Sequence, residues 1–223
     1  MRERLKEGLN CFGLTLDEEA HLRLERFLSE LLRWNRKVNL TAITAHDVAI
    51  EKHLIDSLLL LPLLQNKNTL FDMGSGAGLP GIPLSIARSD LDVLSVDGVG
   101  KKISFQRHAK RVLSLQRFTP VHSRLEDVAG KLATGLRFDV VTARAFSSVE
   151  TIVRLGAPWL STGGKILAMK GPEGEKEVLG AKKIISEAGL RVEYVHSYSL
   201  PFSRSERQVV VLTKEKKTPS TNG

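Results

Sequence analysis

The stretch Leu70-Phe71-Asp72-Met73-Gly74-Ser75-Gly76-Ala77-Gly78-Leu79-Pro80-Gly81 decides the fold of this chain. An apolar run, Thr69–Met73, predicts a buried strand that carries one carboxylate, Asp72. The glycines that follow let the backbone turn sharply and approach a ligand with no side chain in the way. The next segment, 82–88, has the apolar content of a helix whose first turn would point at that ligand.

This glycine loop fits two known patterns. Residues 76–81 satisfy G-x-G-x-x-G, the fingerprint of dinucleotide-binding folds. Asp72, Gly74, Gly76 and Gly78 instead satisfy the D-x-G-x-G-x-G loop of the S-adenosylmethionine-dependent methyltransferases. Both patterns indicate a nucleoside cofactor, and the segments downstream have to decide between them.

Strand-like and helical segments alternate beyond the loop, which predicts parallel strands joined by right-handed crossovers. The expected strands are 92–96, 118–122, 138–142 and 165–169, and the expected helices are 100–115, 124–132, 149–160 and 175–188. The last two β-rich runs, 190–199 and 207–213, are joined by a turn too short for a helix, so they must be antiparallel. The expected fold class is therefore α/β, a Rossmann-like S-adenosylmethionine-dependent methyltransferase sheet that is mostly parallel and ends in an antiparallel hairpin.

The first 65 residues predict an N-terminal helical extension. Apolar side chains recur at helical spacing from Asp17 to Asn35, after a capping box formed by Thr15 and Glu18. A second helical segment runs from about residue 47 to residue 64. Because no Pro/Gly/Ser-rich linker follows, we expect an extension, 1–65, packed on a methyltransferase domain, 66–214, with a flexible tail, 215–223.

Composition narrows the class of protein further. The 223 residues are 42% hydrophobic and 26% charged, as in a soluble globular chain with one sizeable core. A lone cysteine, Cys11, and the absence of an apolar leader at the N-terminus favour the cytoplasm. The longest apolar run, 57–64, is too short to span a membrane. A net charge of +8 fits either a solubilising basic tail or a polyanionic partner such as nucleic acid.

Two acidic positions are candidates for contact with the nucleoside of the cofactor. Asp97 closes the second expected strand, where an acid bonds ribose hydroxyls in either pattern; the alternative is a surface turn before Gly98. Leu125 and Glu126 follow the third strand, where methyltransferase sheets place the adenine. The alternative there is an N-cap serine, Ser123, followed by first-turn acids.

Arg144 follows the fourth strand and is our candidate for the residue that couples cofactor to acceptor. The segment lacks the Asn/Asp-Pro-Pro-aromatic tetrapeptide of enzymes that methylate exocyclic amines, and no cysteine lies near it. The acceptor should therefore already carry a usable lone pair, as guanine N7 does, so that catalysis reduces to alignment and exclusion of water. Arg144 can orient the cofactor carboxylate or guanine O6. Its alternative is a buried structural arginine paired with Asp72 or Asp139.

Basic residues near the expected site are candidates for RNA contacts: Lys101, Lys102, Lys170 and Arg204. For the first two, a solvated helix face is the commoner explanation of such a basic run. His53 and Asp56 stand three residues apart on the extension, a spacing more typical of a hydrogen bond between helices than of a catalytic dyad. No spacing of His, Cys, Asp or Glu resembles a metal site, so we expect none.

The chain resembles the bacterial small-subunit ribosomal RNA guanine-N7 methyltransferases, the glucose-inhibited division protein B family. The resemblance rests on segments spread over nearly the whole length: Trp34–Thr41, His53–Ser57, Asp72–Pro83, Gly100–Lys102, Ser123–Glu126, Arg144–Phe146 and Lys170-Gly171. The prolines after the glycines, Pro80 and Pro83, are absent from generic methyltransferases and dehydrogenases. Met73 and Gly98 depart from the usual residues of the family.

The resemblance implies S-adenosylmethionine contacts at Gly74, Leu79, Leu125, Glu126 and Arg144. It also implies, as substrate, a guanine in the decoding-site (530) loop of 16S rRNA, expected at position 527, within the small ribosomal subunit or its precursor. We expect a monomer with no membrane partner. Two alternatives remain: a non-catalytic rRNA-binding or ribosome-assembly factor with a retained cofactor pocket, and an NAD-dependent oxidoreductase.

Overall fold

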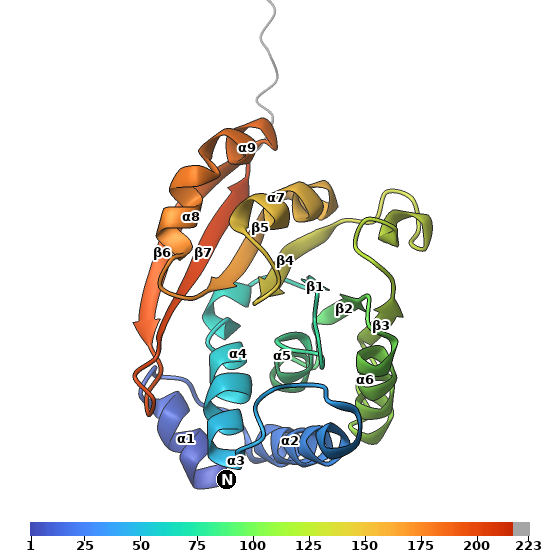
Figure 1. Cartoon of the computed structure of the whole chain (residues 1–223), viewed down its shortest axis with the longest axis vertical. Helices are drawn as coiled ribbons and strands as arrows, with labels where there is room; N and C mark the ends of the chain where they lie inside the picture. The colour runs from blue at the N-terminus through green and yellow to red at the C-terminus, as the bar shows by residue number, and fades with distance from the viewer. Residues whose placement is uncertain (216–223) are drawn as a thin grey trace, which may run out of the picture.

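A seven-stranded sheet forms the centre of the computed structural model, which describes residues 1–215. Of the expected tail only Glu215 is described, and the rest of it lies outside the described residues. The strand order is β3-β2-β1-β4-β5-β7-β6 (Figure 1). The strands are β1 (Thr69–Met73), β2 (Asp92–Asp97), β3 (Phe118–His122), β4 (Phe138–Arg144), β5 (Leu160–Lys170), β6 (Leu190–Ser199) and β7 (Glu206–Lys214).

The register confirms the predicted mixture of parallel and antiparallel strands. Strands β1 to β5 are parallel to one another, with Phe71 opposite both Leu94 of β2 and Val141 of β4. Strand β7 runs antiparallel to both β5 and β6. The chain order reverses between β1 and β4, and ligands of such sheets bind outside the carboxyl ends of the strands at this reversal. The glycine loop and Arg144 both lie there, because each directly follows or ends one of these strands.

Helices cover both faces of the sheet (Figure 1). One face packs against α7 (Val149–Gly156), α8 (Gly174–Gly180) and α9 (Lys182–Glu187). The other packs against α5 (Gly81–Ala87), α6 (Gly100–Val112) and the N-terminal helices. Successive residues of β4 point to opposite faces of the sheet, as the two-residue period of a strand requires. Val140 packs in the core on the side of α5 and α6, and Val141 in the core on the side of α7, α8 and α9. Short 3-10 turns are Leu61–Leu64, Val128–Gly130 and Ala157–Trp159.

The N-terminal extension shares its core with the sheet. It consists of α1 (Arg2–Asn10), α2 (Glu18–Val38), α3 (His46–Ala49), a π-helical turn (Ile50–Ile55) and α4 (Asp56–Leu58). On α2, the buried Phe27 lies 6.0 Å from Phe105 of α6 between ring centroids, and Trp34 lies 5.7 Å from the same ring. These contacts make α2 one wall of the core beneath α5 and α6.

Local expectations differ from the structure at several points. Asp17, not Thr15, caps α2, with its carboxylate accepting from Ala20 N at 2.7 Å. The helical segment expected from residue 47 to 64 is divided between α3, the π-helical turn, α4 and a 3-10 turn. The helix expected at 124–132 is a loop with the single 3-10 turn Val128–Gly130. Val128 is its only fully buried side chain, so this segment has little surface against which an amphipathic helix could pack.

Within residues 1–215, no helix is long and apolar enough to cross a membrane.

We expect Phe27→Ala to lower the free energy of unfolding by about 3–5 kcal/mol, because it empties a fully buried aromatic site between α2 and α6. Urea unfolding followed by circular dichroism should still show one transition, since the extension and the sheet share a core. Leu22→Ala, on the same helix but 52% exposed, is the matched control and should change stability little. Two separate transitions, with only the first shifted, would show that the extension folds by itself.

Candidate functional site

The glycine loop between β1 and α5 uses three backbone conformations that favour glycine. Gly74, Gly76 and Gly78 have φ angles of 63°, 59° and 86°. Ser75 N donates to Val96 O of β2 at 3.1 Å, and Leu79 N donates to Ser75 O at 2.8 Å. The loop is therefore a compact turn fixed to the end of the neighbouring strand.

Asp97, at the end of β2, holds this loop through its side chain. Its Oδ2 accepts from Gly76 N at 2.8 Å and its Oδ1 accepts from Val99 N at 2.8 Å. Each carboxylate oxygen has a second lone pair that can still accept a ligand hydroxyl. From the sequence, Asp97 is predicted to contact the ribose of a cofactor. The structure shows that the same carboxylate also fixes the shape of the glycine loop.

Gln106 of α6 is a functional candidate that the sequence reasoning missed. Its fully buried amide donates through Nε2 to Ser75 Oγ and to Gly76 O, both at 2.8 Å, and its Oε1 accepts from Ser95 Oγ at 2.8 Å. A glutamine on the apolar face of the expected helix was the available signal, since a buried amide needs partners.

Asp72 is a fully buried carboxylate at the start of the loop. Its Oδ2 accepts from Gly81 N at 2.9 Å, while its Oδ1 has no hydrogen-bond partner in the part of the chain that the structure describes. Complete burial raises the pKa of Asp72 to about 7. A Cβ at position 81 would lie 2.7 Å from the Asp72 carboxylate, so only glycine allows this approach.

The loop after β3 contributes the residues expected beside an adenine. Ser123 N donates to Asp97 O at 3.2 Å, which brings this loop against the end of β2. The Ser123 hydroxyl is buried and has no partner among the described residues. Leu125 is half-buried and Glu126 is exposed.

These features fit a nucleoside cofactor. The glycine loop presents backbone free of side chains, Asp97 has spare acceptor capacity, and the unpaired Asp72 and Ser123 atoms retain hydrogen-bonding capacity that a bound polar ligand can use. S-adenosylmethionine carries the ribose, adenine and amino groups that such a set of donors and acceptors requires.

Phe146, in the loop after β4, lies over the first glycine. A Cβ at Gly74 would be 2.3 Å from its Cδ2 atom. Phe146 belongs to the Arg144–Phe146 motif, but its sequence position alone predicts no role for it. The ring also lines the cavity described below, so it lies between the glycine loop and that cavity.

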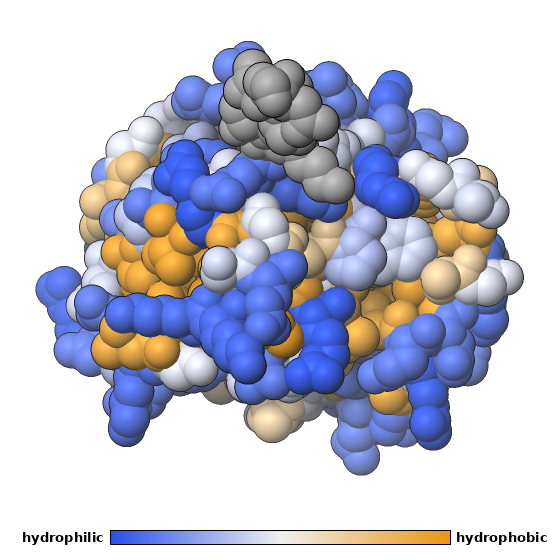
Figure 2. Space-filling model, turned by 90° about the horizontal axis from the view of Figure 1, so that it is seen from above, coloured by the Kyte–Doolittle hydropathy of each residue, from blue (hydrophilic) through white to orange (hydrophobic). Residues whose placement is uncertain are grey.

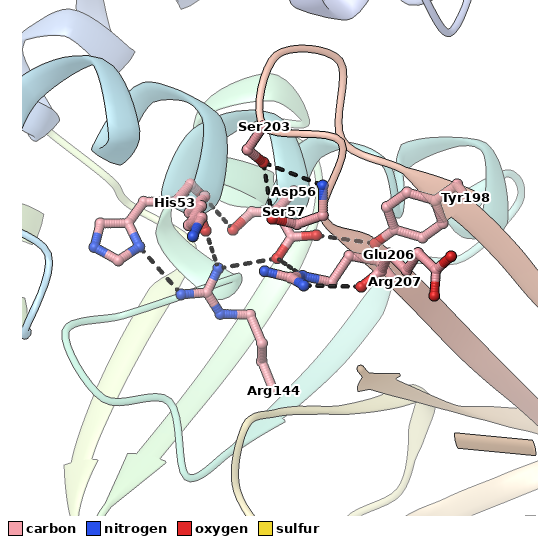
Figure 3. Close-up of polar contacts among 10 residues, drawn as sticks. His53, Asp56, Ser57, Arg144, Tyr198, Ser203, Glu206 and Arg207 are labelled. Carbon is pink, nitrogen blue, oxygen red and sulfur yellow. Dashed lines mark hydrogen bonds and ion pairs between the residues drawn. The ribbon is translucent and has the colours of Figure 1, made fainter. Parts of the chain in front are cut away.

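Arg144 reaches from the end of β4 to the N-terminal extension (Figure 3). Its Nη1 donates to Lys52 O at 2.7 Å and lies 3.5 Å from Asp56 Oδ2, and its Nη2 lies 3.2 Å from His53 Nδ1. None of these hydrogen bonds goes to Asp72 or Asp139, the partners expected for a structural arginine. Asp139 instead accepts from the backbone of Asn68 at 2.9 Å.

The two titratable partners of Arg144 respond differently to burial. Burial, with the charge of Arg144 second, lowers the pKa of His53 to about 4, so the ring is neutral at pH 7. Because a guanidinium only donates, His53 Nδ1 must accept, which assigns the ring proton to Nε2 beside Thr41 Oγ1 at 3.1 Å. Burial raises the pKa of Asp56, opposed by Arg144 and by the Tyr198 hydroxyl that donates to Oδ1 at 2.9 Å.

A cavity of about 500 Å³ opens beside Arg144, at the carboxyl ends of β4 and β5. Four basic residues line it, against two acidic ones: Lys52, Arg144, Lys170 and Arg207, with Asp56 and Glu177. Lys170 Nζ donates to Ser147 O at 2.6 Å and pairs with Glu177 at 2.8 Å. The cavity thus combines net positive charge with one aromatic wall, Phe146.

The remaining basic candidates, Lys101, Lys102 and Arg204, are not among the residues that line this cavity. Lys102 is half-buried, with its Nζ 4.0 Å from the Cβ position of Gly76, whereas Lys101 of the same helix is exposed. Arg204 is exposed in the β6–β7 turn, whose neighbouring residues Phe202 and Ser203 bond Glu51 of the extension.

Among the described residues, no group of three or more His, Cys, Asp or Glu could hold a metal ion. Figure 2, seen from above, shows hydrophobic areas separated by hydrophilic residues.

Comparison with known proteins connects this geometry to a family. Residues 20–210 match the family model described as GidB, rRNA small subunit methyltransferase G. Ribosomal RNA small subunit methyltransferase G of Syntrophotalea carbinolica is 47% identical over 96% of this chain and 99% of that protein. The protein of the same name from Myxococcus xanthus is 42% identical, covering 96% of this chain and 97% of that one.

Solved structures agree on the fold. An O-methyltransferase from Bacillus cereus in complex with SAH superposes with a TM-score of 0.65 at 15% identity, covering 96% of this chain and all of that one. An rRNA methylase from Streptococcus thermophilus gives a TM-score of 0.53 at 12% identity, covering 73% of this chain and 95% of that one.

We expect Asp72→Asn to change how stability depends on pH. With a folded pKa of about 7 against an ordinary 3.8, Asp72 binds a proton in the folded state that the unfolded chain has released between these values. The free energy of unfolding therefore falls as pH rises through this window, and His53, with its lowered pKa, acts in the opposite direction. From pH 5 to pH 8, the free energy of unfolding of the variant should rise relative to that of the wild type by on the order of 2 kcal/mol.

Urea denaturation of both proteins at several pH values measures this difference, and the contribution of His53 cancels in the comparison. Parallel curves for the two proteins would contradict the assignment of a proton to buried Asp72.

Proposed function

The chain belongs to the GidB family of rRNA small subunit methyltransferase G proteins, and we propose that it transfers a methyl group from S-adenosylmethionine to N7 of a guanine in the 530 loop of 16S rRNA. The family is S-adenosylmethionine-dependent, which decides between the two glycine patterns in favour of the methyltransferase. We further propose that the substrate is the small ribosomal subunit or its precursor, and that the protein acts in the cytoplasm as a monomer.

One observation carries the choice of acceptor class. Phe146 contacts the glycine loop on one side and lines the basic cavity on the other. A cofactor in the glycine loop and a nucleotide in the cavity would therefore be neighbours. A cavity with an aromatic wall and four basic side chains suits a base together with its phosphates.

The cofactor side of the site is assigned to residues around the loop. Gly74, Gly76 and Gly78 would let the backbone approach the cofactor, and Asp97 would accept from its ribose. The remaining proposed contacts are Asp72, Leu79, Leu125, Glu126 and Arg144. When bound, S-adenosylmethionine supplies a methyl group on a positively charged sulfur.

The acceptor side needs alignment more than acid–base chemistry. Guanine N7 carries a free lone pair at neutral pH, so the site has no proton to remove before the transfer. Arg144 keeps N–H groups that can donate to guanine O6, which would orient N7 toward the cofactor. Holding donor and acceptor in line can supply much of the rate acceleration, as in other reactions of two bound partners.

The basic residues are proposed to contact RNA in two groups. Lys170, with Lys52 and Arg207, would meet phosphates at the cavity. Lys101, Lys102 and Arg204 would contact more distant parts of the RNA backbone. Such contacts position a nucleic acid without reading its sequence.

Transfer of radiolabelled methyl groups to deproteinised 16S rRNA and to small subunits from a strain lacking this protein tests the proposal. We expect label in the RNA, and chain cleavage at N7-methylguanine should map it to one position in the 530 loop. Binding without any label transfer would instead support a non-catalytic assembly factor. Label at another base atom would overturn the N7 assignment.

We expect Arg144→Lys to lower turnover at least about tenfold while S-adenosylmethionine affinity stays within about threefold, because lysine keeps the charge but loses the planar set of donors. Steady-state methyl transfer and calorimetry measure the two quantities. Arg154→Lys, which alters an exposed arginine paired with Glu150 of the same helix, is the control. Equal turnover of Arg144→Lys and wild type would remove Arg144 from the reaction.

A further inference from the structure

Arg144 belongs to the sheet, yet its hydrogen bonds go to the N-terminal extension. It ends β4, and its contacts are with Lys52 O, His53 Nδ1 and Asp56 Oδ2, all 88 to 92 residues earlier in the chain. Figure 3 shows the guanidinium below the helical turn that carries His53, with Asp56 beside it. Two elements far apart in sequence therefore fix one side chain.

The contacts use part of the guanidinium and leave part of it free. A guanidinium has five N–H donors. Of these, Nη1 faces Lys52 and Asp56 and one N–H of Nη2 faces His53, while Nε–H and the second N–H of Nη2 have no hydrogen-bond partner among the described residues. The side chain is 17% exposed and lines the cavity. Donors thus remain for a molecule bound there.

The two partners are themselves held in place. His53 Nε2 meets Thr41 Oγ1 at 3.1 Å, which orients the ring so that Nδ1 faces Arg144. Asp56 is 6% exposed and accepts from the Tyr198 hydroxyl of β6 at 2.9 Å. These hydrogen bonds restrict the movement of both side chains.

We propose that His53 and Asp56 are positioning residues for methyl transfer, which hold Arg144 with its free N–H groups toward the acceptor base. The inference rests on the proposed function and deepens it, because it assigns two residues of the N-terminal extension to the positioning of Arg144 in the acceptor site. Neither residue is assigned contact with the base or the cofactor.

Charge gives Asp56 a second effect in the same direction. Its Oδ2 lies 3.5 Å from Arg144 Nη1 and 3.9 Å from Arg207 Nε, so one carboxylate offsets two guanidinium groups. When N7 uses its lone pair to form the new bond to the methyl carbon, the carbon–sulfur bond breaks with its electron pair on sulfur, and the guanine becomes a cation. Two arginines without Asp56 would repel that developing charge.

The direct test compares Asp56→Asn with Glu51→Gln. Asn keeps the size of Asp56 and an acceptor for Tyr198, but it removes the charge. Glu51 is buried on the π-helical turn that carries His53; it accepts from Phe202 N and Ser203 N, and no hydrogen bond or ion pair to Arg144 is found among the described residues. Measurements on the full chain are kcat and KM for 16S rRNA, S-adenosylmethionine affinity by calorimetry, and the melting temperature.

We expect Asp56→Asn to lower kcat at least about tenfold with cofactor affinity within about threefold, while Glu51→Gln keeps kcat within about threefold at a temperature where both are folded. A structural role alone predicts equal kcat losses in the two variants, in proportion to their melting temperatures, and that result would overturn the proposal.

His53 allows a rescue experiment. His53→Asn places an amide oxygen near the position of Nδ1, whereas His53→Leu fills the space without an acceptor. We expect the Asn variant to retain several-fold more kcat than the Leu variant, with matched cofactor affinity. Equal kcat in the two variants would exclude a positioning role for the ring.

The wild-type reaction separates this inference from the function on which it depends. No methyl transfer by the wild type would overturn the proposed function and the inference with it. Transfer by the wild type that continues undiminished in Asp56→Asn and His53→Leu would overturn the inference alone.

Discussion

Arg144 stands at the end of a central strand with most of its side chain buried, and a charge in that position must be hydrogen-bonded and paired. The sheet itself supplies none of the hydrogen-bond partners found for it among residues 1–215; the N-terminal extension supplies them. Burial lowers the pKa of the guanidinium, and the charge of Asp56 opposes that effect. The extension and the sheet are therefore joined by a polar contact at the cavity as well as by the apolar core below it.

The cofactor side and the acceptor side have different physical characters. Around the glycine loop, backbone groups are exposed by glycines and two buried polar atoms, Asp72 Oδ1 and Ser123 Oγ, have no partner among the described residues. At the cavity, in contrast, charged groups are numerous and mostly paired with one another. The first environment suits the uncharged ribose and adenine of a nucleoside cofactor, and the second suits a phosphate-bearing nucleotide. Phe146 contacts the glycine loop and also lines the cavity.

Much of the fold could be predicted because its signals are local. The run of apolar strand residues, the glycine loop and the short final turn each lie within a few residues, and the structure confirms the sheet they predicted. The segment 124–132 shows the limit of such patterns, since helical spacing without a surface to pack on did not produce a helix. The N-cap of α2 was misplaced by two residues because Thr15 and Asp17 are both good caps, and only the geometry chooses between them.

The contacts of the site were less predictable, because they join distant parts of the chain. His53 and Asp56 were noticed as a pair, but nothing in the sequence says that Arg144, about ninety residues later, contacts both of them. The most direct measurement is a crystal structure of the full chain with S-adenosylhomocysteine. We expect the ligand across the glycine loop with its adenine beside Ser123, and Arg144 still bonded to His53 and Asp56. A ligand bound elsewhere, or an Arg144 that no longer bonds His53 and Asp56, would contradict this.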